Sequence, residues 1–322
     1  NDAGDDPDAT HLAELVAKVR LKKTPGIELI GGDGVAQVTQ TGLGLEVGTP
    51  SITLIPRKNI TEMVEAELSE SGWAGAEVEI SVPGGEEMAL QTTNARLGLI
   101  GGISILGAHG IVKPYSTAAF RTSVIQAINM AAHRGHSEVV LTTGGKTEQY
   151  GMEHLAHLEK AAFIQAGDFM GISVKHVRKR KITRATVFGM VGKLSKMAAG
   201  VIQTHQAGSR VDMEFLSRLA AEAGAPENVQ TEIKTANTAR HVLEICQASG
   251  HLGLTNVICE YVVRVMADFA ANRHREGAAS ETTSARASAI GTDEGFEVPC
   301  YLVDFAGKVL GQHPPEIAPL SK

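Results

Sequence analysis

Residues 138–151 read EVVLTTGGKTEQYG, an apolar run that ends in two glycines and is followed by Lys146 and Thr147. The run predicts a buried strand, and the glycines predict a loop at its carboxyl end. A loop that cradles a triphosphate has the pattern G-x-x-x-x-G-K-[ST], in which the first glycine starts the turn. Counting back from Gly145, that position holds Val140, in the middle of the strand. We therefore predict a ligand loop at the edge of a parallel sheet, and not a triphosphate site.

Strands and helices alternate around this stretch. Helices are predicted at 116–135, 157–167 and 192–200, and strands at 138–143, 172–177 and 182–190. Three more helices are predicted at 213–224, 238–250 and 254–274. Alternation at this spacing is typical of a parallel, Rossmann-like α/β sheet.

The first hundred residues differ, with short strands broken by glycines and one amphipathic helix at 59–72. We predict two domains, an N-terminal α+β domain over 1–113 and a C-terminal Rossmann-like α/β domain over 114–322. Residues 295–312 read as a strand pair that turns at Phe305, Ala306 and Gly307. The sequence leaves open whether these last strands pack back on the first domain.

Composition excludes several classes of protein. The chain has 322 residues and a net charge of −6, which argues against a surface built for nucleic acid. We see no transmembrane stretch, and a membrane protein is not expected. The three cysteines lie far apart without a CxxC pair, so we expect a reducing, cytoplasmic setting. A homo-oligomer is left open.

A glycine-rich stretch, LGLIGGISILGAHGIVKP, covers residues 97–114. Its glycines allow close approach to a ligand, although they lack the G-x-G-x-x-G spacing of a dinucleotide site; irregular strand packing is the alternative. His154 and His157 lie three apart with Glu153 before them, which is the wrong order for a zincin site. We predict no metal site in the protein.

Two further stretches carry polar chemistry. Residues 174–184, VKHVRKRKITR, reverse the local charge of an acidic chain, although such a run is usually a solvated face. Nucleic acid is one alternative ligand, but with almost no aromatic residues in the run a small polycarboxylate is favoured. In GMVGKLSKMAAGVIQTHQAGSRVD (189–212) a strand ends, glycines turn, and a helix begins with N–H groups free to bind an anion. His205 is the strongest proton-transfer candidate there, since its reference pKa lies near neutrality; a structural histidine is the alternative.

Together with DAGDDPDAT (2–10) and GDGVAQVTQTGLGLEVGTPSI (32–52), these motifs resemble the cobalt-precorrin-5B C1-methyltransferase family of anaerobic cobalamin biosynthesis. The resemblance covers most of the chain in the family's order. It implies two domains and S-adenosylmethionine as methyl donor. The implied substrate is an anionic tetrapyrrole, cobalt-precorrin-5B, methylated at C1 to cobalt-precorrin-6A. Cobalt then enters only as part of the substrate.

The site hypothesis combines both lines of reasoning. One or both of the glycine loops, at 98–110 and 142–145, are expected to contact the donor, and the candidate contacts are Gly98, Gly101, Gly102, Gly107, Thr143, Gly144 and Gly145. Substrate contacts are expected from Lys175, Arg178, Arg180, Gly192 and Thr204. Lys193 and His205 are the catalytic candidates, with His205 as a proton acceptor after methylation.

Other hypotheses remain open at this point. A dinucleotide-dependent oxidoreductase is disfavoured by the missing glycine fingerprint. A non-catalytic tetrapyrrole-binding protein is the third hypothesis. In the resembling family a Gly/Thr/Ala-rich segment lies ahead of the acidic DAGDD stretch, where this chain begins without Met. We expect either a fragment or processed form, or a protein that lacks part of its N-terminal domain and of its site.

Overall fold

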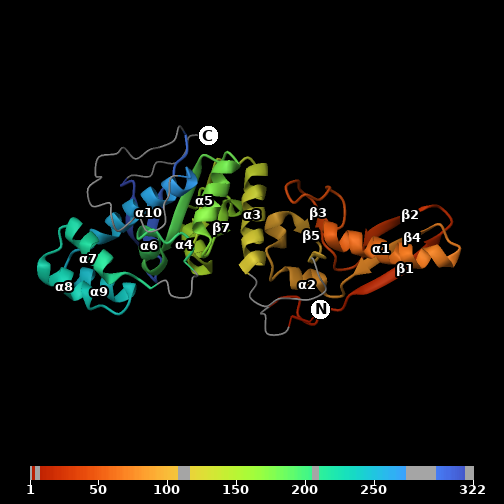
Figure 1. Cartoon of the computed structure of the whole chain (residues 1–322), viewed down its shortest axis with the longest axis horizontal. Coiled ribbons are helices and arrows are strands. Elements are labelled where there is room, and N and C mark those ends of the chain that lie inside the picture. Colours follow the sequence, from red (N-terminus) through yellow and green to blue (C-terminus); the bar gives the residue numbers. More distant parts are fainter. Residues whose placement is uncertain (1, 4–7, 108–116, 205–209, 273–294, 316–322) are drawn as a thin grey trace. The chain divides into compact units, whose positions relative to one another are not determined.

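The chain folds as a mixture of helices and strands in two compact units (Figure 1). The computed structural model describes residues 2–3, 8–107, 117–204, 210–272 and 295–315. The units are Asn1–His133 and Arg134–Lys322. The predicted mixed α/β class is confirmed. The helix over 117–133, which the sequence assigned to the second domain, is grouped with the first unit.

The first unit combines short strands with two longer helices. Its elements are β1 (Val16–Lys22), β2 (Gly26–Gly31), β3 (Gln37–Val38), α1 (Leu54–Ser71), β4 (Gly75–Ser81), α2 (Gly85–Ala89), η1 (Asn94–Leu97), β5 (Leu99–Ile100) and α3 (Thr117–His133). Helix α1 begins before the predicted residue 59, because Thr53 adopts an extended conformation and ends the preceding segment. Gly72, in the left-handed conformation, ends α1 as predicted.

The larger sheet of this unit has the order β1-β4-β2. Strand β4 lies in the centre, antiparallel to β1 and parallel to β2. Val78 and Ile80 of β4 are buried, and Val64 and Leu68 of α1 pack against the same cluster. The other face carries ion pairs such as Lys18 with Glu79 (3.1 Å), which is typical of a sheet with one solvated face.

The second unit alternates strands and helices before a group of helices. Its elements are β6 (Glu138–Thr142), α4 (Gly145–His154), η2 (Lys160–Ala162), β7 (Phe163–Gln165), α5 (Met170–Lys179), β8 (Arg184–Met190), α6 (Val191–Ala198), α7 (Met213–Glu222), α8 (Glu227–Lys234), α9 (Ala239–Ala248), α10 (Leu254–Ala270), β9 (Cys300–Val303) and β10 (Val309–His313). The strands predicted at 138–143 and 182–190 are confirmed.

Two predicted elements of this unit are wrong. Residues 157–167 were predicted as a helix, but they hold η2 and strand β7. Residues 172–177 were predicted as a strand, but they lie in helix α5, whose buried residues Met170, Val174 and Val177 follow the helical period. Helix α8, over 227–234, was not predicted.

The second sheet has the order β10-β9-β8-β6-β7. Strands β7, β6, β8 and β9 are parallel, and β10 pairs antiparallel with β9. The chain moves from β6 to β7 on one side, then crosses to β8 on the other side of β6. The last two strands form the predicted pair and belong to this sheet.

The helices that follow β8 cover one side of this unit. Helix α10 packs against α5, α6 and β10, and α9 packs against α6. Helices α7, α8 and α9 contact each other in sequence. Within the part of the chain that the structure describes, no helix is long and apolar enough to cross a membrane.

Candidate active site

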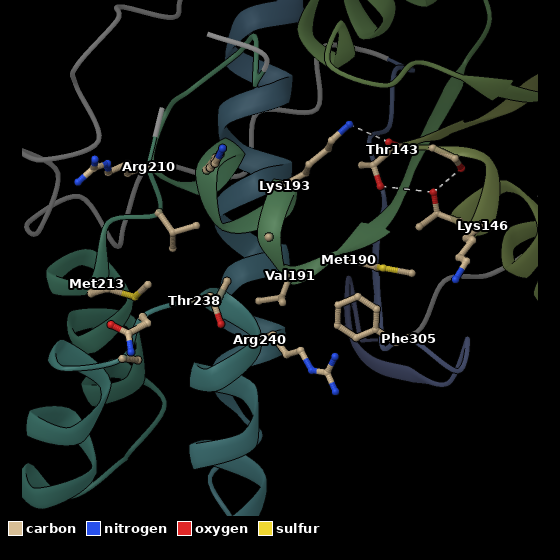
Figure 2. A pocket seen from close by; sticks show the side chains of 18 of the residues that line it. Thr143, Lys146, Met190, Val191, Lys193, Arg210, Met213, Thr238, Arg240 and Phe305 are labelled. Carbon is tan, nitrogen blue, oxygen red and sulfur yellow. Dashed lines mark hydrogen bonds between the residues drawn. The ribbon is translucent and has the colours of Figure 1, made fainter. Parts of the chain in front are cut away.

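A cavity of about 1080 Å³ opens at the carboxyl ends of β6 and β8 (Figure 2). These are the two strands between which the chain changes direction in the sheet, and open α/β sheets bind ligands at such a point. One wall comes from the loops after β6 and β8, and the other from α7 and the start of α9. The lining residues are Thr143, Gly144, Gly145, Lys146, Thr147, Met190, Val191, Gly192, Lys193, Lys196, Arg210, Val211, Met213, Ala236, Asn237, Thr238, Ala239, Arg240 and Phe305.

Two helices begin at this cavity. Gly144 precedes α4, and Met190 precedes α6, and neither residue caps its helix with a side chain. The first N–H groups of both helices are therefore available to a ligand, and the helix dipoles favour a negative charge there. Gly144 and Gly192 have no heavy atom within 4 Å of the position of a Cβ atom, so their backbones border open space.

Positive charge dominates the lining. Lys146, Lys193, Lys196, Arg210 and Arg240 all reach the cavity, and among its described lining residues none is acidic. This is a local reversal in a chain with a net charge of −6. The cavity therefore favours a ligand with several carboxylates over a cationic one.

Lys193 ties the two strand loops together. Its Nζ donates to the carbonyl oxygen of Thr143 at 3.0 Å and lies 3.0 Å from Oδ1 of Asp168 (Figure 2). Thr204 donates its hydroxyl to the same Asp168 oxygen at 2.5 Å. The Lys193 side chain is 37 % exposed, so it is oriented by the protein and still accessible to a ligand.

An apolar strip complements these charges. Val191 at the start of α6 and Met213 at the start of α7 contribute to it, and Met190 at the end of β8 lies on the side of the cavity where Phe305 stands (Figure 2). Phe305 comes from the turn between β9 and β10. The cavity thus combines an apolar surface with cationic groups.

The structure brings together several of the predicted site residues. Thr143, Gly144 and Gly145, predicted for the donor, line the same cavity as Gly192 and Lys193, predicted for substrate and catalysis. Thr204 is connected to Lys193 through Asp168. His205 lies outside the described residues.

The basic run lies elsewhere. Helix α5 starts near Asp168 at the cavity and runs toward the amino ends of the strands, where Thr183 donates to Ser137 O. Arg178 donates to the carbonyl oxygen of Ala270 at 2.9 Å, and Lys175 lies 5.7 Å from the centre of the Phe269 ring. Arg180 ends the helix. None of Lys175, Arg178 and Arg180 lines this cavity, and their substrate role stays a prediction.

The glycines of the first unit fall into two groups. A Cβ on Gly102 would lie 2.1 Å from Gly34 O, and one on Gly98 would lie 2.9 Å from Gln40, so internal packing accounts for both. Gly101 has open space around it and a φ of +83°. Gly107 has a φ of +119° and is exposed. Gly101 and Gly107 remain predicted donor contacts.

Of the five cationic side chains that line the cavity, sequence reasoning predicted only Lys193 as a site residue. Lys196 follows Lys193 by three residues, a spacing that puts both on the same face of a helix, so it could have been found from the GKLSK pattern. Arg210 and Arg240 offered no local signal, because only the fold brings helices α7 and α9 to the loops after β6 and β8. Phe305 was noted as a turn residue and not as a ligand contact.

Two family models, both of the same family, match different parts of the chain. The family described as CbiD matches residues 1–114, and the family described as CbiD, C-terminal domain, matches residues 203–280. A crystal structure titled as a cobalamin biosynthesis protein (cbiD) from Archaeoglobus fulgidus is 22 % identical. It aligns with 76 % of this chain and 63 % of its own, with a TM-score of 0.27, too low to support an argument about the fold.

Two curated relatives carry the name cobalt-precorrin-5B C(1)-methyltransferase. The protein from Leptospira interrogans serogroup Icterohaemorrhagiae serovar copenhageni is 55 % identical over 311 residues, which are 97 % of this chain and 79 % of that protein. The protein from Rubrobacter xylanophilus is 48 % identical over 269 residues, 84 % of this chain and 69 % of its own. The chain belongs to the CbiD family of cobalt-precorrin-5B C(1)-methyltransferases.

Proposed function

We propose that this chain transfers a methyl group from S-adenosylmethionine to C1 of cobalt-precorrin-5B, giving cobalt-precorrin-6A, and that the cavity of the second unit binds the substrate's carboxylates. The relatives named above support the reaction. The lining supports the site, since five cationic side chains and two helix N-termini meet there without an acidic neighbour among the described lining residues. Corrinoid precursors carry several acetate and propionate groups, which charge-assisted hydrogen bonds hold well.

The chemistry of the lining distinguishes the two reactants. A sulfonium donor supplies the methyl group, and the S–CH₃ bond breaks as an electron pair of the macrocycle forms the new C–CH₃ bond. The cationic lining does not fit a sulfonium, so we derive no donor contact from it. Thr143, Gly144 and Gly145 are instead proposed to meet a substrate carboxylate through the N-terminal N–H groups of α4.

The protein's own contribution is positioning. Lys193 is held by Thr143 O and Asp168, which fixes the distance between the two strand loops under the substrate. An in-line displacement depends mainly on the alignment of two bound molecules and on the exclusion of water. The parallel strands and their connecting helices support a Rossmann-like assignment of the second unit. Its three cysteines are buried thiols, which supports a reducing cytoplasm.

An anaerobic assay with methyl-labelled donor and purified cobalt-precorrin-5B tests both halves of the proposal. The double variant Lys146→Gln/Lys196→Gln should raise the KM for the corrinoid at least about tenfold, because each lost charged hydrogen bond is worth about 1.5–3 kcal/mol. The KM for the donor should stay unchanged. Lys160→Gln is the matched control, since Lys160 is exposed and lies at the amino end of β7, away from the cavity.

Three outcomes are informative. Methyl transfer with the expected KM change supports reaction and site. Methyl transfer with an unchanged corrinoid KM in the double variant would contradict the proposed substrate site and support the proposed reaction. Binding of the corrinoid without transfer would favour a tetrapyrrole-binding protein over an enzyme.

A further inference from the structure

An exposed aromatic ring stands at the mouth of the substrate cavity. The side chain of Phe305 is 51 % exposed, although burying a phenylalanine side chain normally stabilises a protein by roughly 1.5–3 kcal/mol. Among the described residues that line the cavity, it is the single aromatic side chain.

The turn that carries Phe305 is fixed by several bonds. The carboxylate of Asp304 accepts from the backbone N–H of Ala306 at 2.8 Å and from that of Lys308 at 2.9 Å. The hydroxyl of Tyr150 donates to the carbonyl oxygen of Phe305 at 2.8 Å. Gly307 has a φ of +86°, and a Cβ there would lie 2.5 Å from the Tyr150 ring. The backbone under the exposed ring is therefore held in one position.

Arg240 lies over this ring. The centre of its guanidinium group lies 4.9 Å from the Phe305 ring, and Figure 2 shows the two side chains next to each other at one edge of the cavity. Arg240 is itself oriented by Glu244, whose carboxylate accepts from Nε at 3.0 Å. The terminal guanidinium nitrogens stay available to a further anion.

This pair matches one part of the proposed substrate. A guanidinium beside an aromatic ring offers a planar, apolar and cationic surface, which suits a conjugated macrocycle that carries carboxylates at its edge. A small acyclic polycarboxylate would use the lysines of the cavity and would gain nothing from the ring. Fixing the surface before binding reduces the entropy that the complex loses.

Resting on the proposed function, we propose that Phe305 and Arg240 form a stacking platform for the tetrapyrrole macrocycle, with the Arg240 guanidinium also pairing with one of its carboxylates. Phe305 then selects for a conjugated ring, while Lys146, Lys193, Lys196 and Arg210 select for negative charge. Tyr150 and Asp304 are positioning residues, because they act through the turn and do not touch the ligand.

Binding of two probes tests the platform. Uroporphyrin III is a planar tetrapyrrole with eight carboxylates, and its dissociation constant for the full-length chain can be measured by fluorescence. Phe305→Ala should weaken its binding roughly tenfold to a hundredfold, as expected for the loss of a buried ring contact. Phe305→Leu should fall between, and Phe305→Trp should retain wild-type affinity. Citrate carries charge but no ring, and its dissociation constant can be measured by competition with uroporphyrin. This constant should be the same in wild type and Phe305→Ala.

The guanidinium has a matched control. Arg218 of α7 lies 5.6 Å from the ring of Phe215 in a similar arrangement but does not line the cavity. Arg240→Gln should weaken uroporphyrin binding about tenfold, Arg240→Lys should recover part of the loss, and Arg218→Gln should leave it unchanged. Tyr150→Phe removes the bond to the turn and should weaken uroporphyrin binding severalfold with no effect on citrate.

Methyl transfer by the same proteins separates this inference from the proposed function. The KM for cobalt-precorrin-5B should rise in Phe305→Ala while kcat and the donor KM change little. Equal uroporphyrin affinity of wild type, Phe305→Ala and Arg240→Gln, each with the wild-type unfolding midpoint, overturns the platform even if methyl transfer is intact. Absence of transfer in wild type overturns the proposed function, and the two-probe comparison still decides the platform.

Discussion

Gly144 and Gly192 each offer a clean way to fill the cavity by one methyl group. Neither has a heavy atom within 4 Å of the Cβ position, and neither has a φ that strains an L-residue. We expect Gly144→Ala and Gly192→Ala to fold normally and to raise the corrinoid KM severalfold, because each methyl group enters space that the substrate uses. Steady-state kinetics with both substrates will show this as a change in one KM only.

Gly253 provides the control for these two variants. A Cβ on Gly253 meets Ala223 at 3.6 Å, an ordinary contact, and the residue does not line the cavity. Gly253→Ala should leave both KM values unchanged. If Gly144→Ala and Gly192→Ala behave like Gly253→Ala, the corrinoid does not reach the loops after β6 and β8.

Lys193 makes a structural contact and also lines the cavity. A structural role affects the stability of the fold, whereas a binding role affects the KM for the corrinoid. The Lys193 side chain is 37 % exposed, so its ion pair with Asp168 should stabilise the fold by at most about 1 kcal/mol. Lys193→Gln should therefore lower the thermal midpoint only slightly and raise the corrinoid KM about tenfold or more. Thermal unfolding and kinetics on one preparation separate the two. A large loss of stability with an unchanged KM would make Lys193 purely structural.

At the scale of elements, the strongest polar link of the second sheet lies at the amino ends of its strands. Arg184 of β8 pairs with Glu138 of β6 at 3.5 Å and with Glu297, just before β9, at 2.6 Å. Thr186 donates to Glu138 at 2.7 Å. The side chains of Arg184 and Glu138 are 7 % and 6 % exposed, so loss of one would leave the other as a buried charge.

Arg184→Met should therefore reduce the free energy of unfolding by about 3–5 kcal/mol, measured by urea denaturation. Glu297→Gln should cost about 1 kcal/mol or less, since that carboxylate is 49 % exposed. Neither change should alter the corrinoid KM of the folded protein, because the network lies at the edge opposite to the cavity. Equal, small effects of both substitutions would mean that the buried pair does not stabilise the sheet.

Sequence patterns identified the long elements well and the short ones poorly. Strands β6, with five residues, and β8, with seven, were predicted because each contains a run of apolar, strand-forming residues in the sequence. Strand β7 has three residues, too few to show a period against the alanines around it. In α5, Ile172 and Val174 suggested a strand, whereas burial of Met170, Ser173 and Val177 follows a helix face that includes a glycine and a serine.

For the whole molecule, titration of two histidines predicts how stability depends on pH. Burial, and then the charges of Arg180 and Lys179, hold the pKa of His176 below its usual value of 6.5. Burial also lowers the pKa of His313, with Arg264 lowering it further and Glu260 opposing. Below pH 6.5 both histidines are protonated in the unfolded chain, while in the folded protein they stay neutral until the pH reaches their lowered pKa values. Stability should therefore fall as the pH drops from 6.5 toward the folded pKa values, and level off below them.

Urea denaturation between pH 7.5 and pH 5 checks this slope. His176→Gln should show a smaller loss of stability over that interval than wild type. An unchanged slope in His176→Gln would show that His176 does not contribute to it.

The candidate site could be predicted only in part, because it is assembled from five separate stretches of the chain. The loops at 143–147 and 190–196 follow apolar strands, so the carboxyl-edge rule located them. The basic run at 174–184 was predicted as a substrate contact because of its density of charge. Most of it lies on helix α5, which leads away from the cavity. Arg210, Arg240 and Phe305 became visible only once the helices and the final turn were placed around the sheet.

The most direct test combines the reaction with the cavity. The full chain and a Gly192→Trp variant, which fills the open space beside Gly192, are incubated anaerobically with ¹³C-methyl S-adenosylmethionine and cobalt-precorrin-5B. Wild type should give a product with one enriched methyl carbon, at C1 by NMR. The variant, with an unchanged unfolding midpoint, should bind the corrinoid weakly and transfer little label. A folded Gly192→Trp variant with wild-type rate and affinity, or a wild type that labels no carbon or a different one, would contradict the proposal.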